Sequence, residues 1–157
     1  MKPNSFFSLL PTTAAAIALP LGKRGFVPSD SCCFTLHDAS TNLTIKQTKN
    51  NGFLTLSGDN PDGWYCINLS DSRRVLWDAS NNACFINPDQ AFQCLDPTPS
   101  SDVWSIQDAR EGALVAVNDR TDFHACGEGV FTDDKGGCRG LKLKATGLQG
   151  SCGSFSG

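Results

Sequence analysis

The feature that most constrains this chain is a set of eight cysteines, all of which follow residue 31. An even number of cysteines in a small secreted chain indicates a disulfide framework. A bond between adjacent residues is strained, so we expect Cys32 and Cys33 to have different partners. Spacing suggests two local loops, Cys84 with Cys94 and Cys126 with Cys138. The complete set is Cys32, Cys33, Cys66, Cys84, Cys94, Cys126, Cys138 and Cys152.

The first 24 residues have the features of a secretory leader. Lys2 precedes an apolar stretch at residues 6–20, and residues 16–18 read Ala-Ile-Ala, a small-x-small cleavage site. The stretch is too short, and too broken by Pro11, to span a bilayer. The basic pair Lys23-Arg24 follows. A subtilisin-like protease of the secretory route that cuts after this pair would make Gly25 the mature N-terminus.

Charge and composition favour one acidic extracellular domain. Loss of Lys2, Lys23 and Arg24 changes the formal net charge from −3 to −6. No basic cluster remains, so we expect neither nucleic-acid binding nor membrane binding after processing. The predicted organisation is a signal peptide with a short pro-piece at 1–24, an N-terminal segment at 25–31, a cysteine-rich β domain at 32–152 and a flexible tail at 153–157.

Short apolar runs alternate with turn residues along the whole domain, which predicts an all-β fold of about a dozen short antiparallel strands. Both a β-trefoil and a two-sheet sandwich fit this pattern. Trp64, Trp77 and Trp104 are unevenly spaced, and no clear internal repeat is found, which disfavours a strict threefold repeat. The expected strands are 33–37, 43–47, 53–57, 64–69, 74–78, 83–87, 92–95, 103–107, 113–118, 123–126, 129–132 and 139–145.

The residues suggest glycan chemistry more than catalysis. Trp64-Tyr65 and Trp77 lie near asparagines and aspartate, the combination that stacks on sugar rings and binds hydroxyls. Burial in the core is the alternative for these rings, and the one we expect for Trp104. The sequons at Asn42 and Asn68 are potential N-glycosylation sites.

Catalytic and metal chemistry have little support. The chain has no Gly-x-Ser-x-Gly motif, and most of its acidic residues fall in turns, where they bond to their own backbone. Zinc is the alternative use of the cysteines, but no Cys-x-x-Cys pair is present. We therefore expect no catalytic residues, no cofactor and no metal site.

The order of motifs from Phe92 to Ala145 is distinctive. It resembles the C-terminal domain of fungal cell-wall mannoproteins with internal repeats, the PIR group and its PhiA-like relatives. A basic processing pair before the domain also fits that group. The motifs are Ala91-Phe92-Gln93-Cys94, Asp96-Pro97-Thr98-Pro99, Val103-Trp104-Ser105-Ile106, Asp122-Phe123-His124-Ala125-Cys126, Gly129-Val130-Phe131-Thr132-Asp133 and Leu141-Lys142-Leu143-Lys144-Ala145.

The resemblance implies a secreted, non-enzymatic structural protein of the fungal cell wall. Cys94 stands where the family pattern has an aromatic residue, and the Gln-rich repeat that carries the glucan ester link in that family is missing. Wall association would therefore depend on disulfides or on non-covalent contacts, with β-glucan, chitin or wall proteins as partners. The alternatives are a lectin-like module that uses Trp64 or Trp77, and a small secreted effector that acts on a host or competitor.

Overall fold

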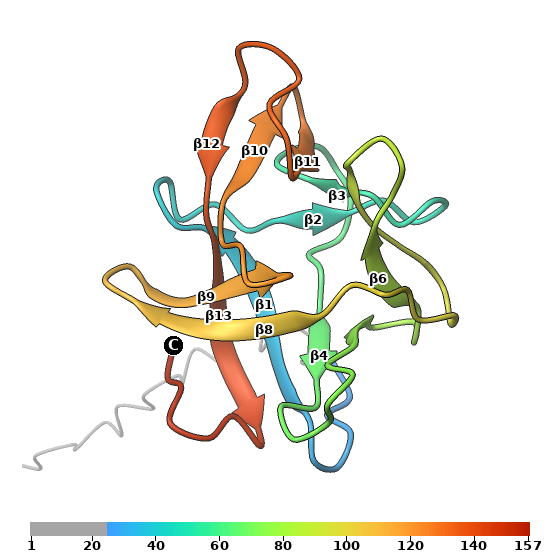
Figure 1. Ribbon diagram of the computed structural model, residues 1–157, viewed down its shortest axis with the longest axis vertical. Coiled ribbons are helices and arrows are strands. Elements are labelled where there is room, and N and C mark those ends of the chain that lie inside the picture. The colour runs from blue at the N-terminus through green and yellow to red at the C-terminus, as the bar shows by residue number, and fades with distance from the viewer. Residues whose placement is uncertain (1–24) are drawn as a thin grey trace, which may run out of the picture.

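The computed structural model describes residues 25–157 and is all-β, as predicted. The predicted leader, with Lys23 and Arg24, lies outside the described residues. The strands fall into three consecutive groups (Figure 1). The first group is β1 Cys32–Asp38, β2 Lys46–Gln47, β3 Leu54–Thr55 and β4 Tyr65–Ile67. The second is β5 Leu76–Asp78, β6 Ala83–Ile86, β7 Phe92–Asp96 and β8 Trp104–Ala109. The third is β9 Gly112–Val117, β10 Phe123–Cys126, β11 Gly129–Phe131, β12 Arg139–Leu141 and β13 Leu143–Gly150.

The first and last strands of the three groups form a ring. They are neighbours in the order β5-β4-β1-β13-β9-β8, and all of these pairs are antiparallel. The two ends of the row meet where the backbone N–H of Trp104, at the start of β8, donates to the carbonyl of Arg74, just before β5, at 3.0 Å. Closing the row in this way leaves little unpaired strand edge.

The remaining strands form hairpins that cover one end of the ring. The three hairpins are β2–β3, β6–β7 and β10–β11, and β12 pairs with β10. Single bridges join each hairpin to the next, Thr55 with Gly129, Phe53 with Gln93 and Ala91 with Phe131. In Figure 1 the β2–β3 and β10–β11 hairpins occupy the upper half, β6 lies at the right, and β4 and much of β13 lie in the lower half. This connectivity is that of a β-trefoil, which resolves the choice between trefoil and sandwich.

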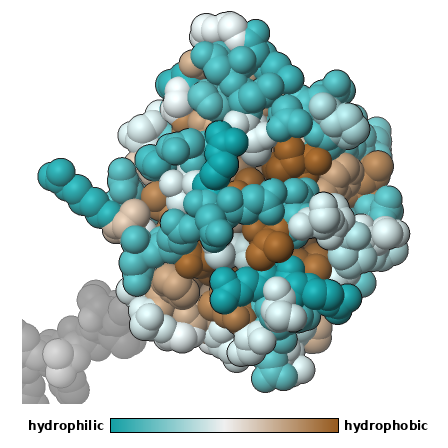
Figure 2. Space-filling view, in the orientation of Figure 1, coloured by the Kyte–Doolittle hydropathy of each residue, from teal (hydrophilic) through white to brown (hydrophobic). Residues whose placement is uncertain are grey.

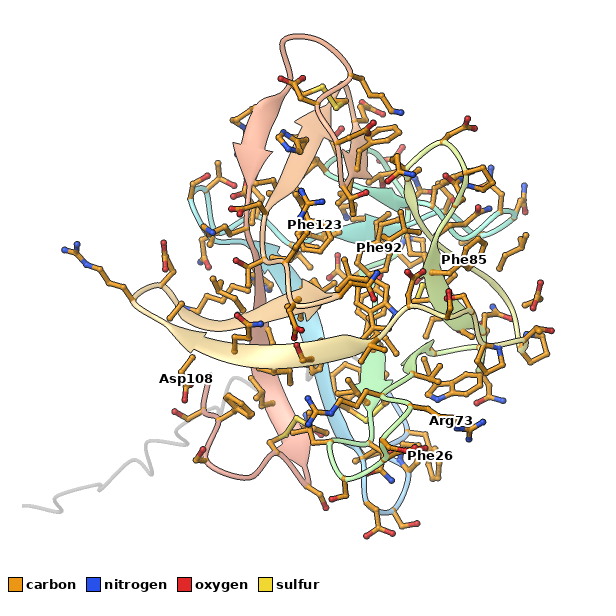
Figure 3. All side chains as sticks on the ribbon, viewed as in Figure 1. Phe26, Arg73, Phe85, Phe92, Asp108 and Phe123 are labelled. Carbon is orange, nitrogen blue, oxygen red and sulfur yellow. A yellow bond between two sulfur atoms is a disulfide. The ribbon has the colours of Figure 1, made fainter. Side chains whose placement is uncertain are left out.

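The interior lies between the ring and the hairpins. Phe92 packs against Trp104 with ring centroids 4.5 Å apart, and against Phe123 with centroids 6.0 Å apart. Trp104 is fully buried, as predicted, and its Nε1–H donates to the carbonyl of Cys84 at 3.1 Å. Figure 3 shows Phe92 and Phe123 inside the molecule, whereas Phe26 lies near its lower edge. Large buried aromatic rings therefore supply much of the core of this small domain.

The threefold architecture has a sequence counterpart, which corrects the expectation that no repeat exists. The turn after β1 reads Asp38-Ala39-Ser40-Thr41-Asn42, and the turn after β5 reads Asp78-Ala79-Ser80-Asn81-Asn82. The tryptophans were a poor guide to symmetry because only Trp104 belongs to the core, while Trp64 and Trp77 are half-buried.

All eight cysteines form disulfides within the chain, as predicted. The two local loops, Cys84–Cys94 and Cys126–Cys138, are confirmed. The adjacent pair also separates as expected, because Cys32 bonds to Cys152 while Cys33 bonds to Cys66. Such a framework is typical of proteins that fold in an oxidising compartment.

The outer surface is mainly polar. The face shown in Figure 2 is largely hydrophilic, with small separate hydrophobic areas. Residues 25–157 include no helix that is long and apolar enough to cross a membrane. In the predicted tail, Phe155 is half-buried and packs against the core.

Candidate functional site

The trefoil contains three equivalent junctions where two ring strands end side by side. In each junction the first residue of one strand is paired with the last residue of its neighbour. The pairs are Leu143 with Asp38, Tyr65 with Asp78 and Trp104 with Val117. The first member of every pair is buried, so the three junctions can be compared position by position.

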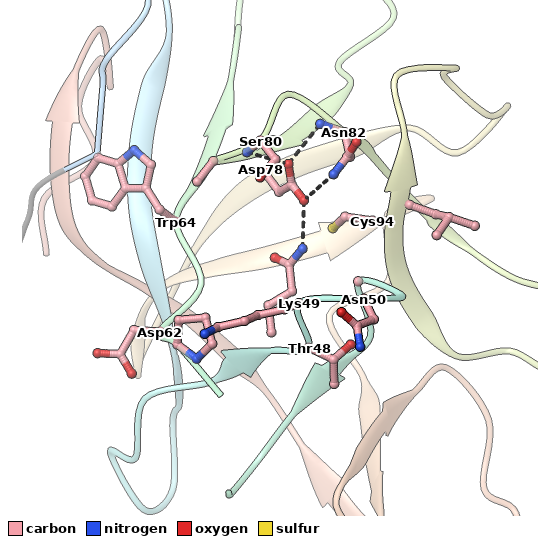
Figure 4. A pocket seen from close by; sticks show the side chains of 14 residues that line it. Thr48, Lys49, Asn50, Asp62, Trp64, Asp78, Ser80, Asn82 and Cys94 are labelled. Carbon is pink, nitrogen blue, oxygen red and sulfur yellow. Dashed lines mark hydrogen bonds between the residues drawn. The ribbon is translucent and has the colours of Figure 1, made fainter. Parts of the chain in front are cut away.

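The Asp78 junction holds a buried carboxylate among neutral donors. Oδ1 of Asp78 accepts from the backbone N–H of Ser80 at 2.9 Å and of Asn82 at 2.8 Å. Oδ2 accepts from the side-chain amides of Gln47 at 2.7 Å and Asn82 at 3.1 Å (Figure 4). Because both amides turn their N–H toward Asp78, their carbonyl oxygens are left to accept hydrogen bonds from a ligand.

The Asp38 junction begins with the same Asp-Ala-Ser sequence, in a turn one residue longer, and adds a cation. Oδ2 of Asp38 is 2.7 Å from Nη2 of Arg139, and Oδ1 accepts from the backbone N–H and the hydroxyl of Ser40. Burial opposes ionisation of Asp38, but Arg139 and Ser40 outweigh it and lower the pKa of this carboxyl to about 2. This junction is therefore closed by a charged pair.

The third junction has no carboxylate, since Val117 stands in the place of the two aspartates and is buried. The residues before the paired positions differ as well. They are Lys142, Trp64 and Val103, in the order of the Asp38, Asp78 and Val117 junctions. Only the Asp78 junction therefore combines a buried carboxylate with an aromatic ring.

The backbone explains why the Asp78 junction is open. At the other two junctions the strands are linked by one more hydrogen bond, from Ala39 N to Lys142 O at 2.9 Å and from Asn118 N to Val103 O at 2.8 Å. Among the described residues, the corresponding bond between Ala79 and Trp64 is not formed. Strands β4 and β5 therefore separate beyond Tyr65 and Asp78.

A polar hollow lies at this opening. Its volume is about 290 Å³, and Gln47, Thr48, Asn50, Asp78 and Asn82 are among the residues that line it. In Figure 4 the indole of Trp64 stands to one side, while Asp78 and Asn82 lie across from Thr48 and Asn50. Amide, hydroxyl and carboxylate groups thus converge beside an aromatic ring, and these groups can hydrogen-bond to a polar organic ligand.

A second, more aromatic hollow adjoins the first. Its volume is about 450 Å³, and Phe26, Pro28, Trp64 and Trp77 contribute to its walls. Trp64, Asp78 and Ala79 line both hollows, so the two are adjacent. We call the two hollows together the Trp64 groove and define it by Phe26, Trp64 and Trp77 at the aromatic end and Gln47, Asp78 and Asn82 at the polar end.

The structure brings together two of the three predicted platform residues. Trp64 and Trp77 are half-buried, and both line the groove. Tyr65 has no exposed surface and its hydroxyl has no partner among the described residues, so its proposed role as a platform is wrong. Burial, together with the negative charge of Asp78, raises the pKa of Tyr65 well above its ordinary value. Alternation along β4 explains the error, because neighbouring residues of a strand face opposite ways.

Three groove residues were missed from sequence. Phe26 was placed in the N-terminal segment 25–31, to which no role was given. In the structure 83 % of its surface is exposed. Gln47 and Asp78 were placed in the expected strands 43–47 and 74–78, and only the fold brings their side chains to within 2.7 Å of each other. The one available signal was the repeated Asp-Ala-Ser turn, since two copies of a turn in one chain invite a comparison of their surroundings.

The predicted glycosylation sites lie on the surface of the first repeat and at its end. Asn42 is exposed in the turn after β1, and Asn68 is half-buried just after β4. The side-chain oxygen of Asn68 accepts from the backbone N–H of Ser70 at 2.9 Å. Glycosylation of either residue stays a prediction.

Within residues 25–157, no group of three or more His, Cys, Asp or Glu side chains is placed to hold a metal ion. Comparisons with models of known families, with curated proteins and with solved structures find no match for this chain. The fold and the groove therefore define a structural class rather than a family. The class is that of compact, disulfide-stapled β-trefoil domains, here with one open junction.

Proposed function

We propose that this protein is a secreted, non-enzymatic component of the fungal cell wall that holds to wall polysaccharide through the Trp64 groove. The observation that carries the proposal is the open Asp78 junction, where two oriented amides face a groove with aromatic walls. Aromatic rings offer flat apolar faces that suit the C–H faces of sugar rings. The oxygens of Gln47 and Asn82 suit sugar hydroxyls, which are hydrogen-bond donors.

The disulfides favour non-covalent attachment. All eight cysteines of the chain are paired with one another, so no thiol is left to form a bond to another wall protein. Polysaccharide is therefore the partner that we propose, with β-glucan and chitin as the two chemistries to test. The resemblance to the C-terminal domain of PIR mannoproteins supports the same location.

Retention on insoluble polysaccharide tests the proposal. The mature protein should be retained by β-glucan or chitin, and Trp64→Ala and Trp77→Ala should each reduce retention at least about fivefold, because removing a central aromatic contact costs more than about 1 kcal/mol. Lys142→Ala is the matched control, since Lys142 has the place of Trp64 in the Asp38 junction.

Fractionation of producing cells tests the location. A wall protein held by polysaccharide should stay in the wall fraction with or without thiol reductant. In the retention experiment, two results would contradict the proposal. One is no retention on either polysaccharide, and the other is equal retention of the wild type and the Trp64→Ala, Trp77→Ala and Lys142→Ala variants. Recovery from the culture fluid alone would favour a diffusible effector instead.

A further inference from the structure

The residues directly after the basic pair Lys23-Arg24 form one wall of the Trp64 groove. Gly25, Phe26 and Pro28 line the aromatic hollow together with Trp64 and Trp77. Gly25 is the residue that a cut after Arg24 would leave at the N-terminus. The residue that would become the mature N-terminus therefore lies at the candidate ligand site, although Trp64 is far from Gly25 in the sequence.

The contact between Gly25 and Trp64 is very close. A Cβ atom built on Gly25 would lie 2.2 Å from Cδ1 and 2.4 Å from Nε1 of the Trp64 ring. Only glycine lets the backbone approach the ring to this extent. The next residue secures the contact, because Nε1–H of Trp64 donates to the carbonyl of Phe26 at 3.2 Å.

The other end of the segment is fixed to the body of the domain. A backbone hydrogen bond from Ser31 N to Pro28 O, at 3.3 Å, closes a turn, and Cys32 then bonds to Cys152. Val27 lies close to Gly150, where a Cβ atom would come within 2.8 Å of its side chain. Residues 25–31 are thus held at both ends, with Gly25 on the indole of Trp64.

We propose that cleavage after Arg24 gives the Trp64 groove its ligand-binding form, because it creates a free α-amino group on Gly25 and releases residue 24. The cut hydrolyses the peptide bond between Arg24 and Gly25, consumes one water molecule and leaves a carboxylate on Arg24 and an α-amino group on Gly25. A protease of the secretory route that recognises basic pairs supplies the catalysis. The new amino group is bonded to the Cα atom of Gly25, which packs against the ring of Trp64, in a hollow that Asp78 also lines.

Two physical changes follow from the cut. An α-amino group has an ordinary pKa of about 8, so at neutral and acidic pH it is a cation beside an aromatic ring, and the two attract each other. In the uncut chain the same nitrogen is a neutral amide. Residue 24 also stays covalently attached to this nitrogen, which belongs to a residue that lines the groove. Ligand access to Trp64 therefore differs between the two forms.

The inference rests on the proposed function only for its ligand-binding readout. Three purified proteins separate the effects: the mature form that starts at Gly25, a form that retains residues 19–24 with Lys23→Gln and Arg24→Gln, and a control that carries the same six residues after Gly157. The indole N–H signal of Trp64 in NMR spectra, assigned with Trp64→Phe, reports the contact without any ligand. Retention on polysaccharide reports access to the groove.

In the mature form and in the C-terminally extended control, the Trp64 signal should shift with a pH midpoint near ~8, and in the uncut form it should not. The variant Gly25→Ala should lose this titration and keep the fold. The uncut form should bind polysaccharide about tenfold more weakly, because a tenfold change corresponds to the loss of about one central contact.

The inference is overturned if the Trp64 signal is the same in all three proteins, or if the cut and uncut forms are both retained on polysaccharide and bind it equally. It is also overturned if the protein secreted by a host with a dibasic-specific protease starts at Leu19 rather than Gly25. If the Trp64 signal titrates but no form is retained on polysaccharide, the position of the new N-terminus beside Trp64 is supported and the proposed function is refuted.

Discussion

The Asp38 and Asp78 junctions begin with the same three residues and end differently. Both turns read Asp-Ala-Ser, and both aspartates accept a backbone N–H from the serine two residues later at 2.9 Å. In the first junction the outer oxygen of the carboxylate meets Arg139, and in the second it meets the amides of Gln47 and Asn82. One junction is closed by charge, and the other opens into the Trp64 groove.

The difference shows that a repeated turn does not carry a function by itself. Arg139 can pair with the Asp38 carboxylate because β12 lies beside the turn. The backbone hydrogen bond from Ala39 N to Lys142 O closes the rest of this junction. The side chains that bond to Asp78, Gln47 and Asn82, are shorter than arginine and neutral. Among the described residues, the corresponding backbone bond between Ala79 and Trp64 is missing. Side chains from distant strands decide whether the carboxylate serves stability or positions ligand-binding amides.

The largest expected effect is on stability and comes from the closed junction. Arg139→Ala leaves the buried Asp38 carboxylate without its cation, which should lower the free energy of unfolding by about 3 kcal/mol. Gln47→Ala removes one neutral donor from Asp78 and should cost only about 1 kcal/mol. Urea denaturation at pH 7 measures both values, and equal losses would contradict the contrast between the junctions.

Acid should act on the closed junction next. The pKa of Asp38 is about 2 in the folded protein, below the ordinary value of 3.8. A carboxyl whose pKa is lowered by folding stabilises the fold above its unfolded pKa, and this stability is lost as the pH falls from about 4 to about 2. The loss should be about 2 kcal/mol. Urea curves at several pH values should show it in the wild type and show a smaller loss in Arg139→Ala.

Ligand binding should distinguish the two turns at their last motif residue. Asn82→Ala removes an amide oxygen from the polar end of the groove and should weaken polysaccharide binding about fivefold to tenfold. The control in the other turn is Asn42→Gly, made in protein produced without glycans, because Asn42 has a φ of 60° that glycine tolerates. Isothermal titration with soluble oligosaccharides measures both, and an equal loss in the control would show that the effect is not local.

The smallest effect should come from Lys142. Its ammonium is 2.9 Å from Asp122, but both side chains are well exposed. Lys142 also lowers the pKa of Asp122, yet an exposed pair of this kind contributes little to stability. Lys142→Ala should therefore change the unfolding free energy by less than about 0.5 kcal/mol and leave ligand binding intact. A larger loss would make it unsuitable as a control for Trp64→Ala.

Local patterns predicted the elements well and the site only in part. Turn residues located nearly all strands, although the expected run 139–145 is divided between β12 and β13, and 43–47 is reduced to Lys46–Gln47. Cysteine spacing found the local loops Cys84–Cys94 and Cys126–Cys138, because their strands are close in sequence.

The rest depends on contacts between distant strands. Gln47 meets Asp78 and Arg139 meets Asp38 only after the ring has closed, so no local pattern announces them. Tyr65 and Trp64 are adjacent in the sequence, and only the register of β4 with β5 decides which of them faces the core. The threefold arrangement was also hidden, since only two of the three repeats share the Asp-Ala-Ser turn and the features common to all three are buried positions.

The central claim is that ligand binds at the Asp78 junction and not at the Asp38 junction, and both can be observed in one NMR titration with β-glucan and chitin oligosaccharides. The account predicts that the backbone N–H signals of Ser80 and Asn82 and the indole signal of Trp64 shift together, while Ser40 and Asn42 stay unchanged. Shifts of equal size at Ser40, or no shift at either turn with both oligosaccharides, would contradict it.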